Sequence, residues 1–328
     1  MRFGIIGAGR IGKIHASNVA ARKDCEVRLI ADADSAAAQS LADATGGRVA
    51  GIDAILASSE IDAVAICAPT DMHADLIEKA ARAKKTIFCE KPVDLDANRV
   101  RACLEVVAAT GAILMVGFNR RFDPNFAALQ QRIRDGAIGA VEIVSITSRD
   151  PSPPPVSYIA RSGGLFRDMM IHDFDMARFL LGEEPVAVSA MGSALVDKAI
   201  GEAGDVDTAV VILETKSGKV AQISNSRRAT YGYDQRIEAH GSKGMIRADN
   251  IRETSVEFAG AQGFASDKVL NFFLERYAAA YRDELDAFVK AASAGVAPKP
   301  GGEDGLRANL LADAAHLSWR TKQRVTLG

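Results

Sequence analysis

Residues 2–12 read Arg-Phe-Gly-Ile-Ile-Gly-Ala-Gly-Arg-Ile-Gly, a short apolar run that ends at glycines and leads into helix-forming residues. The glycines Gly7, Gly9 and Gly12 have the spacing Gly-x-Gly-x-x-Gly, which gains weight where it follows a strand and opens a helix. Gly7 permits a tight turn, Gly9 lets a pyrophosphate approach the backbone, and Gly12 lets the helix pack closely on the strand. The N–H groups that begin the helix would face the phosphates. The stretch predicts a strand–loop–helix unit that binds a dinucleotide.

The alternation of strand and helix continues through the first third of the chain. Its strands are continuous apolar runs, as expected for a parallel sheet with helices on both faces. We expect strands at residues 2–6, 26–31, 61–67, 86–89 and 112–116, and helices at 10–22, 35–45, 72–84 and 94–109. This order predicts an α/β fold, with a doubly wound parallel sheet of the Rossmann type over residues 1–120.

The pattern changes after residue 120. The Pro cluster at 151–155 is interpreted as an ordered loop, because structured elements run close on both sides. We expect helices at 121–135, 167–181, 272–293 and 303–320, and strands at 140–148, 186–196, 207–215, 219–227, 234–240 and 245–248. Residues 121–328 are therefore predicted to form an α+β domain with an open, mostly antiparallel sheet, whose C-terminal helices are free to pack back on the first domain.

Composition and charge exclude several classes of partner. The 328 residues include 40 basic and 42 acidic side chains, for a net charge of -2. No block of like charge stands out, so neither nucleic acid nor an acidic membrane is expected as a partner. Four cysteines, without a Cys-x-x-Cys pair or a His at zinc-ligand spacing, are interpreted as small buried hydrophobes in a reducing compartment, and no metal is expected.

The N-terminus begins directly with a predicted strand, so we expect no secretory signal. The apolar stretch 106–119 is too short to cross a bilayer and is interrupted at Thr110 and Gly111. The expected location is the cytoplasm.

Asp32 indicates which dinucleotide is bound. It ends the second predicted strand, twenty residues after Gly12. A carboxylate there accepts hydrogen bonds from the adenosine ribose of NAD and repels the 2′-phosphate of NADP. The alternative role, a helix cap, suits Asp34 better. Thr70 follows the next apolar strand at the same sheet edge, where it either donates its hydroxyl to the cofactor or is an ordinary loop residue. Arg10 and Ile11, which open the first helix, complete this group of cofactor-binding candidates.

Two further stretches supply candidates for chemistry. Glu90-Lys91-Pro92 follows the strand at 86–89, where Lys91 points into the cleft unless it is a solvated surface lysine, and Glu90 joins the cofactor-binding candidates. In the predicted helix 167–181, Asp168 and His172 are four residues apart and share one face. A His beside a carboxylate is suited to taking a proton from an alcohol, although such pairs are often structural.

The order GAGRIG, Asp32, APT, EKP, GFNRRFD (117–123) and GGLFRDMMIHDFD (163–175) resembles the family named for glucose–fructose oxidoreductase, inositol dehydrogenase and the rhizopine-catabolism oxidoreductases. The resemblance covers essentially the whole chain. It implies a Rossmann domain followed by an open-sheet domain, and often assembly into tetramers through that sheet. Three stretches resemble the bacterial inositol 2-dehydrogenases within the family, namely 147–151, 120–123 and 231–234.

The resemblance also implies roles. Lys91 contacts the reacting hydroxyl, Asp168 binds the substrate and polarises the His, and His172 is the general base. Asp150 and Tyr233 are expected to line the substrate pocket, although a strand-end acid and a strand aromatic explain them equally. The implied reaction is oxidation of myo-inositol by NAD to 2-keto-myo-inositol, with a homotetramer as the expected assembly.

Three alternatives stay open. The same chemistry could act on scyllo-inositol, chiro-inositol or another sugar. A regulator that binds the dinucleotide without turnover would be expected to lack Lys91, Asp168 and His172, which are all present. An enzyme that holds its cofactor permanently and couples two sugars would be expected to carry an additional N-terminal segment.

Overall fold

The computed structural model describes residues 1–159 and 161–328. The chain forms two compact units. The first consists of Met1–Asn119 and Ala280–Asn309, and the second of Arg120–Ala279 and Leu310–Gly328. The C-terminal segment thus contributes helical residues to both units.

A parallel sheet forms the centre of the first unit, as the continuous apolar runs predict. Every residue of its strand β4 is buried. The strand order is β3-β2-β1-β4-β5-β6. The bounds are β1 (Arg2–Ile6), β2 (Glu26–Ala31), β3 (Arg48–Val49), β4 (Ala63–Ile66), β5 (Thr86–Glu90) and β6 (Leu114–Gly117). The order reverses between β1 and β4, and ligands of open α/β sheets bind outside the carboxyl ends of the strands at such a switch point. The predicted doubly wound sheet is confirmed.

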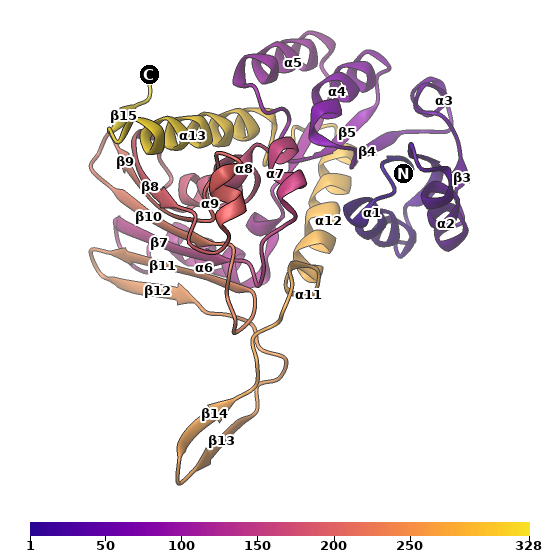
Figure 1. Ribbon diagram of the computed structural model, residues 1–328. Helices are drawn as coiled ribbons and strands as arrows, with labels where there is room; N and C mark the ends of the chain where they lie inside the picture. Colours follow the sequence, from indigo (N-terminus) through magenta and orange to yellow (C-terminus); the bar gives the residue numbers. More distant parts are fainter. The chain divides into compact units, whose positions relative to one another are not determined.

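Helices connect these strands (Figure 1). They are α1 (Arg10–Ala20), α2 (Ser35–Thr45), α3 (Ile52–Ala57), η1 (Thr70–Met72), α4 (His73–Arg82) and α5 (Ala97–Thr110), with α12 (Ala278–Ala294) added from the C-terminal part. The carboxylate of Asp34 accepts the N–H groups of Ala36 and Ala37 at the start of α2. Asp34 therefore caps this helix, as its position predicts, and Asp32 is left for the sheet edge.

A mixed sheet forms the centre of the second unit. Its order is β12-β11-β7-β10-β9-β8-β15. The bounds are β7 (Val141–Arg149), β8 (Pro185–Ser193), β9 (Thr208–Thr215), β10 (Val220–Ser226), β11 (Asp234–Gly241), β12 (Gly244–Ala248) and β15 (Val325–Thr326). β7 and β10 run parallel, whereas the other neighbours are antiparallel. The expectation of an open, mostly antiparallel sheet is confirmed.

One face of this sheet is covered and the other carries exposed apolar side chains. Ile146, Leu213 and Ile223 are buried, and α9 packs against β7 and β10. On the opposite face, Ile143 of β7 and Ile212 of β9 are exposed. Alternation of side chains along each strand explains the difference between neighbouring positions.

The helices of the second unit are η2 (Asn119–Phe122), α6 (Pro124–Arg134), α7 (Val156–Ser162), α8 (Gly164–Asp168), α9 (Ile171–Leu181), α10 (Lys198–Glu202), α11 (Phe273–Arg276) and α13 (Gly302–Thr321), the last shared with the first unit. The prediction of one helix over 167–181 is wrong, because α8 ends at Asp168 and α9 begins at Ile171. The N–H of Met170 bonds the carbonyl of Leu165, five residues back, which breaks the regular helical spacing. Asp168 and His172 therefore lie on two different helices rather than one face of a single helix.

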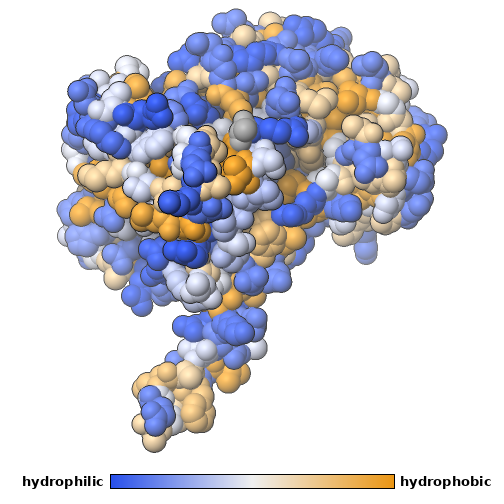
Figure 2. Space-filling view, in the orientation of Figure 1, coloured by the Kyte–Doolittle hydropathy of each residue, from blue (hydrophilic) through white to orange (hydrophobic). Residues whose placement is uncertain are grey.

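A hairpin of β13 (Glu257–Gly260) and β14 (Gly263–Ser266) extends from the body of the second unit (Figure 1). Its apolar side chains are exposed, including Phe258 and Phe264. In Figure 2 much of the projecting hairpin has the colour of hydrophobic residues. The sequence pattern did not predict this hairpin.

The four cysteines are free, and Cys25, Cys89 and Cys103 are buried. Across the described residues, we find no helix that combines the length and the apolar character needed to cross a bilayer.

Candidate active site

The glycine-rich loop connects β1 to α1 at the switch point of the first sheet. Gly7 has φ +108, and a Cβ there would lie 2.4 Å from the carbonyl oxygen of Cys67. A Cβ on Gly12 would lie 1.9 Å from the carbonyl oxygen of Gly7. These two glycines are therefore required by the loop itself. A Cβ on Gly9, in contrast, would meet no atom within 4 Å. The open space at Gly9 suits the close approach of a dinucleotide pyrophosphate.

The start of α1 offers uncapped backbone N–H groups, because Gly9 supplies no side chain to cap them. Arg10 is exposed and Ile11 is half-buried in this first turn. The end of β2 lies against the same loop, since the Asp32 carboxylate accepts the N–H of Ala8 at 2.5 Å and that of Asp34 at 2.8 Å. The donor set and the open space fit a dinucleotide at this edge.

His73 joins two loops of this edge. Its Nδ1 lies 2.7 Å from the carbonyl oxygen of Pro92, and its Nε2 lies 2.7 Å from that of Ala68. The loop of Ala68 continues to Thr70, the half-buried first residue of η1, and the loop of Pro92 contains Lys91. His73 is 1% exposed. The residue was missed by the sequence analysis, although it lies only three positions after Thr70.

Glu90 and Lys91 stand where β5 ends. The carboxylate of Glu90 is hydrogen bonded to Nε2 of His15 at 2.7 Å, so its observed contact is with α1 of its own unit. Lys91 is half-buried and directly follows. Lys91 thus stands at the carboxyl edge of the sheet, the place that its position after a strand predicts.

In the second unit, Asp150 and Asp168 are brought together by Arg227, which the sequence analysis missed. Nη2 of Arg227 lies 3.4 Å from Oδ2 of Asp168, and Nη1 lies 3.9 Å from Oδ2 of Asp150. The Arg227 side chain is only 2% exposed. Asp168 also accepts a hydrogen bond from the hydroxyl of Tyr158 at 3.1 Å. Asp150, Asp168 and Arg227 thus form one charged group.

Within this charged group, the pKa of Asp150 is shifted. The pKa of Asp150 is raised to about 6, chiefly by burial, while the charge of Arg227 lowers it and that of Asp168 raises it. One carboxyl of the pair is therefore close to titrating near neutral pH. His172 lies in the first turn of α9 and is half-buried, four positions along the chain from Asp168.

Tyr233 is buried just before β11. Its ring stands perpendicular to that of Tyr277, with 5.9 Å between centroids. Burial raises its pKa well above the usual value, so the phenol stays protonated. The guanidinium of Arg120 lies over the Tyr277 ring at 5.7 Å. Tyr233 therefore belongs to a buried aromatic and cationic layer.

The other charged residues of the sequence motifs form buried ion pairs and a helix cap in the second unit. Arg120 bonds Asp173 at 2.5 Å, and Arg121 binds both oxygens of Asp175, at 2.6 and 2.7 Å. Asp123 caps α6 and pairs with Arg276. The arginines at 120 and 121 are thus anchors for α9 rather than exposed groups.

Known proteins resemble this chain over its full length. Residues 1–118 match the oxidoreductase family with an NAD-binding Rossmann fold (GFO/IDH/MocA), and residues 126–247 match the GFO/IDH/MocA C-terminal domain. The chain is 60% identical to inositol 2-dehydrogenase of Rhizobium meliloti, over 100% of this chain and 99% of that protein. It is 48% identical to myo-inositol 2-dehydrogenase of Thermotoga maritima, over 100% and 98%. The crystal structure of scyllo-inositol dehydrogenase from Lactobacillus casei with bound NAD(H) and scyllo-inositol superimposes with a TM-score of 0.92 at 29% identity, over 99% of this chain and 98% of that one.

Proposed function

Because this chain belongs to the GFO/IDH/MocA family of NAD-binding oxidoreductases, we propose that it oxidises myo-inositol with NAD to 2-keto-myo-inositol. The observation that carries the proposal is the 60% identity, along the whole chain, to an inositol 2-dehydrogenase. Retention of Lys91, Asp168 and His172 supports turnover rather than a purely regulatory role. The second candidate is scyllo-inositol, because a relative of the same fold binds it.

NAD would be held by the first unit. Gly7, Gly9 and Gly12 shape the loop, and the backbone at Arg10 and Ile11 offers N–H groups to the pyrophosphate. Asp32 retains acceptor capacity for the adenosine ribose beyond its two backbone bonds. Thr70 and Glu90 stand along the same edge. When bound, the nicotinamide supplies the hydride acceptor.

The proton would be handled by the second unit. His172 takes the proton of the reacting hydroxyl, and Asp168 orients the imidazole and binds the substrate. The ammonium group of Lys91 stabilises the negative charge that develops on the oxygen. Asp150 and Tyr233 line the pocket, where carboxylate and phenol groups recognise the other hydroxyls of a polyol. These roles agree with the charged group around Arg227.

We also propose that the exposed sheet face assembles four copies. Ile143, Val210, Ile212 and Met245 are exposed, and the strand register places their side chains on one face. Large apolar side chains exposed on one sheet face mark an interaction site in many proteins. The second unit would then both bind substrate and mediate assembly. Free cysteines are consistent with a cytoplasmic enzyme.

The proposal is tested by following NADH formation with purified protein. Myo-inositol, scyllo-inositol, chiro-inositol and glucose are supplied separately, each with NAD and with NADP. We expect the highest kcat/KM for myo-inositol with NAD, and much poorer activity with NADP because of Asp32. A preference for another polyol would discard the named substrate. Measurable NAD binding without turnover of any of the four would contradict the proposed activity.

A further inference from the structure

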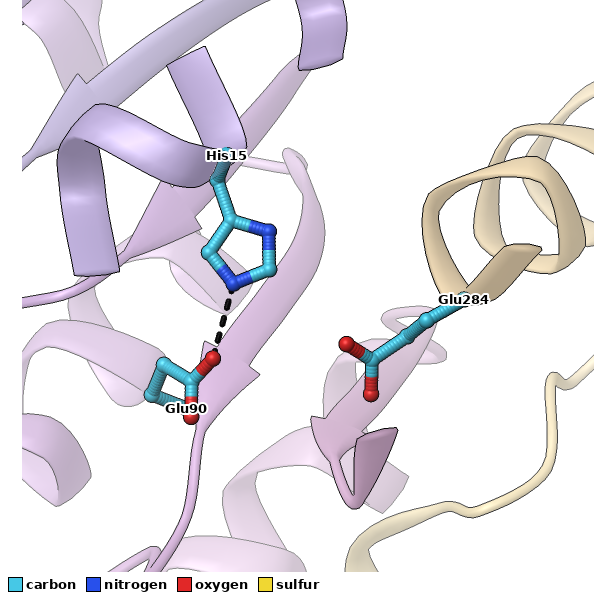
Figure 3. A group of neighbouring side chains, drawn as sticks. All are labelled: His15, Glu90 and Glu284. Atoms are coloured by element: carbon cyan, nitrogen blue, oxygen red, sulfur yellow. Dashed lines mark hydrogen bonds and ion pairs between the residues drawn. The ribbon is translucent and has the colours of Figure 1, made fainter. Parts of the chain in front are cut away.

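Three titratable side chains meet behind the dinucleotide edge of the first unit. They are His15 of α1, Glu90 at the end of β5 and Glu284 of α12. The His nitrogen and the carboxylate oxygens lie within 4.8 Å of one another. Figure 3 shows the carboxyl group of Glu284 pointing toward the hydrogen-bonded pair of His15 and Glu90. None of the roles assigned above to the cofactor or the substrate uses Glu284.

The group is enclosed by aromatic rings and backbone. The His15 ring packs on Phe88 with 4.7 Å between centroids and stands perpendicular to Tyr281 at 5.6 Å. A Cβ on Gly117 of β6 would lie 3.1 Å from Oε2 of Glu90, so the glycine leaves the space that this carboxylate occupies. Burial, and then the charge of Glu90, raise the pKa of the Cys67 thiol, which follows β4. These contacts hold the His15 ring and the Glu90 carboxylate in place, and the Glu90 side chain is only 12% exposed.

Glu284 itself is 0% exposed, and neither carboxyl oxygen has a hydrogen-bond partner among the described residues. Burial, and then the charge of Glu90, raise its pKa well above the ordinary value of 4.5. An ionised carboxylate in such surroundings would be very unfavourable, whereas the neutral acid carries a proton to donate.

A metal ion explains the geometry less well than a proton does. His15 Nε2 and Glu90 Oε1 are only 2.7 Å apart, which is a hydrogen-bond distance. Two ligands of one tetrahedral zinc ion, each about 2.1 Å from it, would stand roughly 3.4 Å apart.

We infer that Glu284 is held as the neutral acid with its carboxyl group facing the hydrogen-bonded pair of His15 and Glu90, so that the three side chains form one buried network that positions the end of β5. Glu284 is then a positioning residue. Because Lys91 is the next residue after Glu90, the network fixes the direction in which Lys91 leaves the sheet. This consequence rests on the function proposed above for Lys91.

Stability against pH tests the protonation state without any substrate. An acid whose pKa is higher in the folded than in the unfolded chain makes the free energy of unfolding fall as pH rises above its ordinary value. We expect Glu284 to contribute such a fall to the wild-type stability curve between about pH 5 and 8, a range that begins just above the ordinary pKa of glutamate. Glu284→Gln, which keeps the shape and a donor but cannot ionise, should show a shallower fall. Asp283→Asn, on the exposed side of the same helix, should follow the wild-type curve.

Kinetics and NADH binding test the positioning role. Glu284→Ala should lower kcat about tenfold or more, since small misplacements of reacting groups have large effects, while the NADH dissociation constant changes less than about threefold. Glu284→Gln, in contrast, should keep most of the wild-type kcat. The inference is overturned if Glu284→Gln has the same pH slope as the wild type, if it is as impaired as Glu284→Ala, or if elemental analysis finds a stoichiometric metal ion that His15→Ala removes. Should no polyol be turned over, the proposed function fails, and the stability and NADH-binding measurements still decide the protonation of Glu284.

Discussion

Arg227 is the residue on which the charge of the second unit's site depends. Its guanidinium is buried and lies within 4 Å of the carboxylates of Asp150 and Asp168. The pKa of Asp150 is raised to about 6 by burial, and the charge of Arg227 keeps it from rising further. Arg227 therefore favours the ionised form of Asp150 at neutral pH.

Replacement of Arg227 by Met should shift the pH profile of kcat/KM. Loss of the positive charge raises the pKa of Asp150, so the acidic limb of the profile moves to higher pH. Activity at pH 6, which lies at the pKa of Asp150, should fall more than activity at pH 8, about two units above it. Steady-state kinetics across this range measure the effect, and Arg228→Met, an exposed neighbour, serves as the control. An unshifted limb in a folded variant would refute the role of Arg227.

His172→Ala tests the proposed base. General base catalysis contributes about 10²–10⁴-fold, so kcat should fall by about that factor while NAD affinity is kept. Turnover is measured by NADH absorbance, and NAD binding by calorimetry. His240→Ala removes an exposed histidine of the same unit and should leave both quantities unchanged. Near-normal turnover of His172→Ala would show that another group accepts the proton.

Single residues were predictable from sequence where a motif fixes them. Asp32, Asp34 and the three glycines of the loop lie where their spacing places them. His73, Arg227 and Glu284 were missed, because their partners are distant in sequence. Glu284 carried a signal, since it falls between Tyr281, Leu285 and Phe288 on the buried side of α12. A carboxyl group on the apolar side of a helix is unusual. It indicates either that the group has a charged or hydrogen-bonding partner or that it is protonated.

At the scale of elements, the glycines of the glycine-rich loop have two different roles: Gly12 is required by the fold, whereas Gly9 leaves space for the ligand. Gly12→Ala places a methyl group against the backbone of Gly7 and should destabilise the protein by about 1–3 kcal/mol. Gly9→Ala meets no atom of the protein, and the φ of -69 at this position suits alanine.

Gly9→Ala should therefore unfold at nearly the wild-type temperature and yet bind NAD at least tenfold more weakly, about 1.4 kcal/mol in binding free energy. Calorimetric titration and thermal unfolding measure the two effects. Unchanged NAD affinity would place the pyrophosphate elsewhere.

Helices and strands were predictable where burial of one face imposes a regular spacing of apolar residues. Apart from the two-residue edge strands β3 and β15, which were not predicted, the strands of both sheets were expected close to their observed bounds, because continuous or alternating apolar residues mark them. The hairpin β13–β14 was not, since its apolar residues are exposed and follow no core pattern. The break between α8 and α9 falls at Met169 and Met170, two helix-forming residues that give no local sign of an interruption. Tertiary packing decides such positions.

For the whole molecule, the exposed face of the second sheet carries the prediction about assembly. The double change Val210→Glu and Ile212→Glu puts two charges on that face, where desolvation would be costly. We expect sedimentation to show smaller species than the tetramer proposed for the wild type, with little change in folding. Leu195→Glu changes an exposed apolar residue outside the strands and should leave the assembly intact. A wild-type protein that sediments as a monomer would contradict the proposed tetramer.

The claim that hydride passes from C2 of myo-inositol to NAD is tested most directly with myo-inositol deuterated at C2. We expect the deuterium to appear in the reduced cofactor, detected by mass spectrometry, and the organic product to be the 2-ketone. Reduced cofactor without deuterium, or deuterium retained in the organic product, would show that another carbon is oxidised. Either result would contradict the proposed reaction.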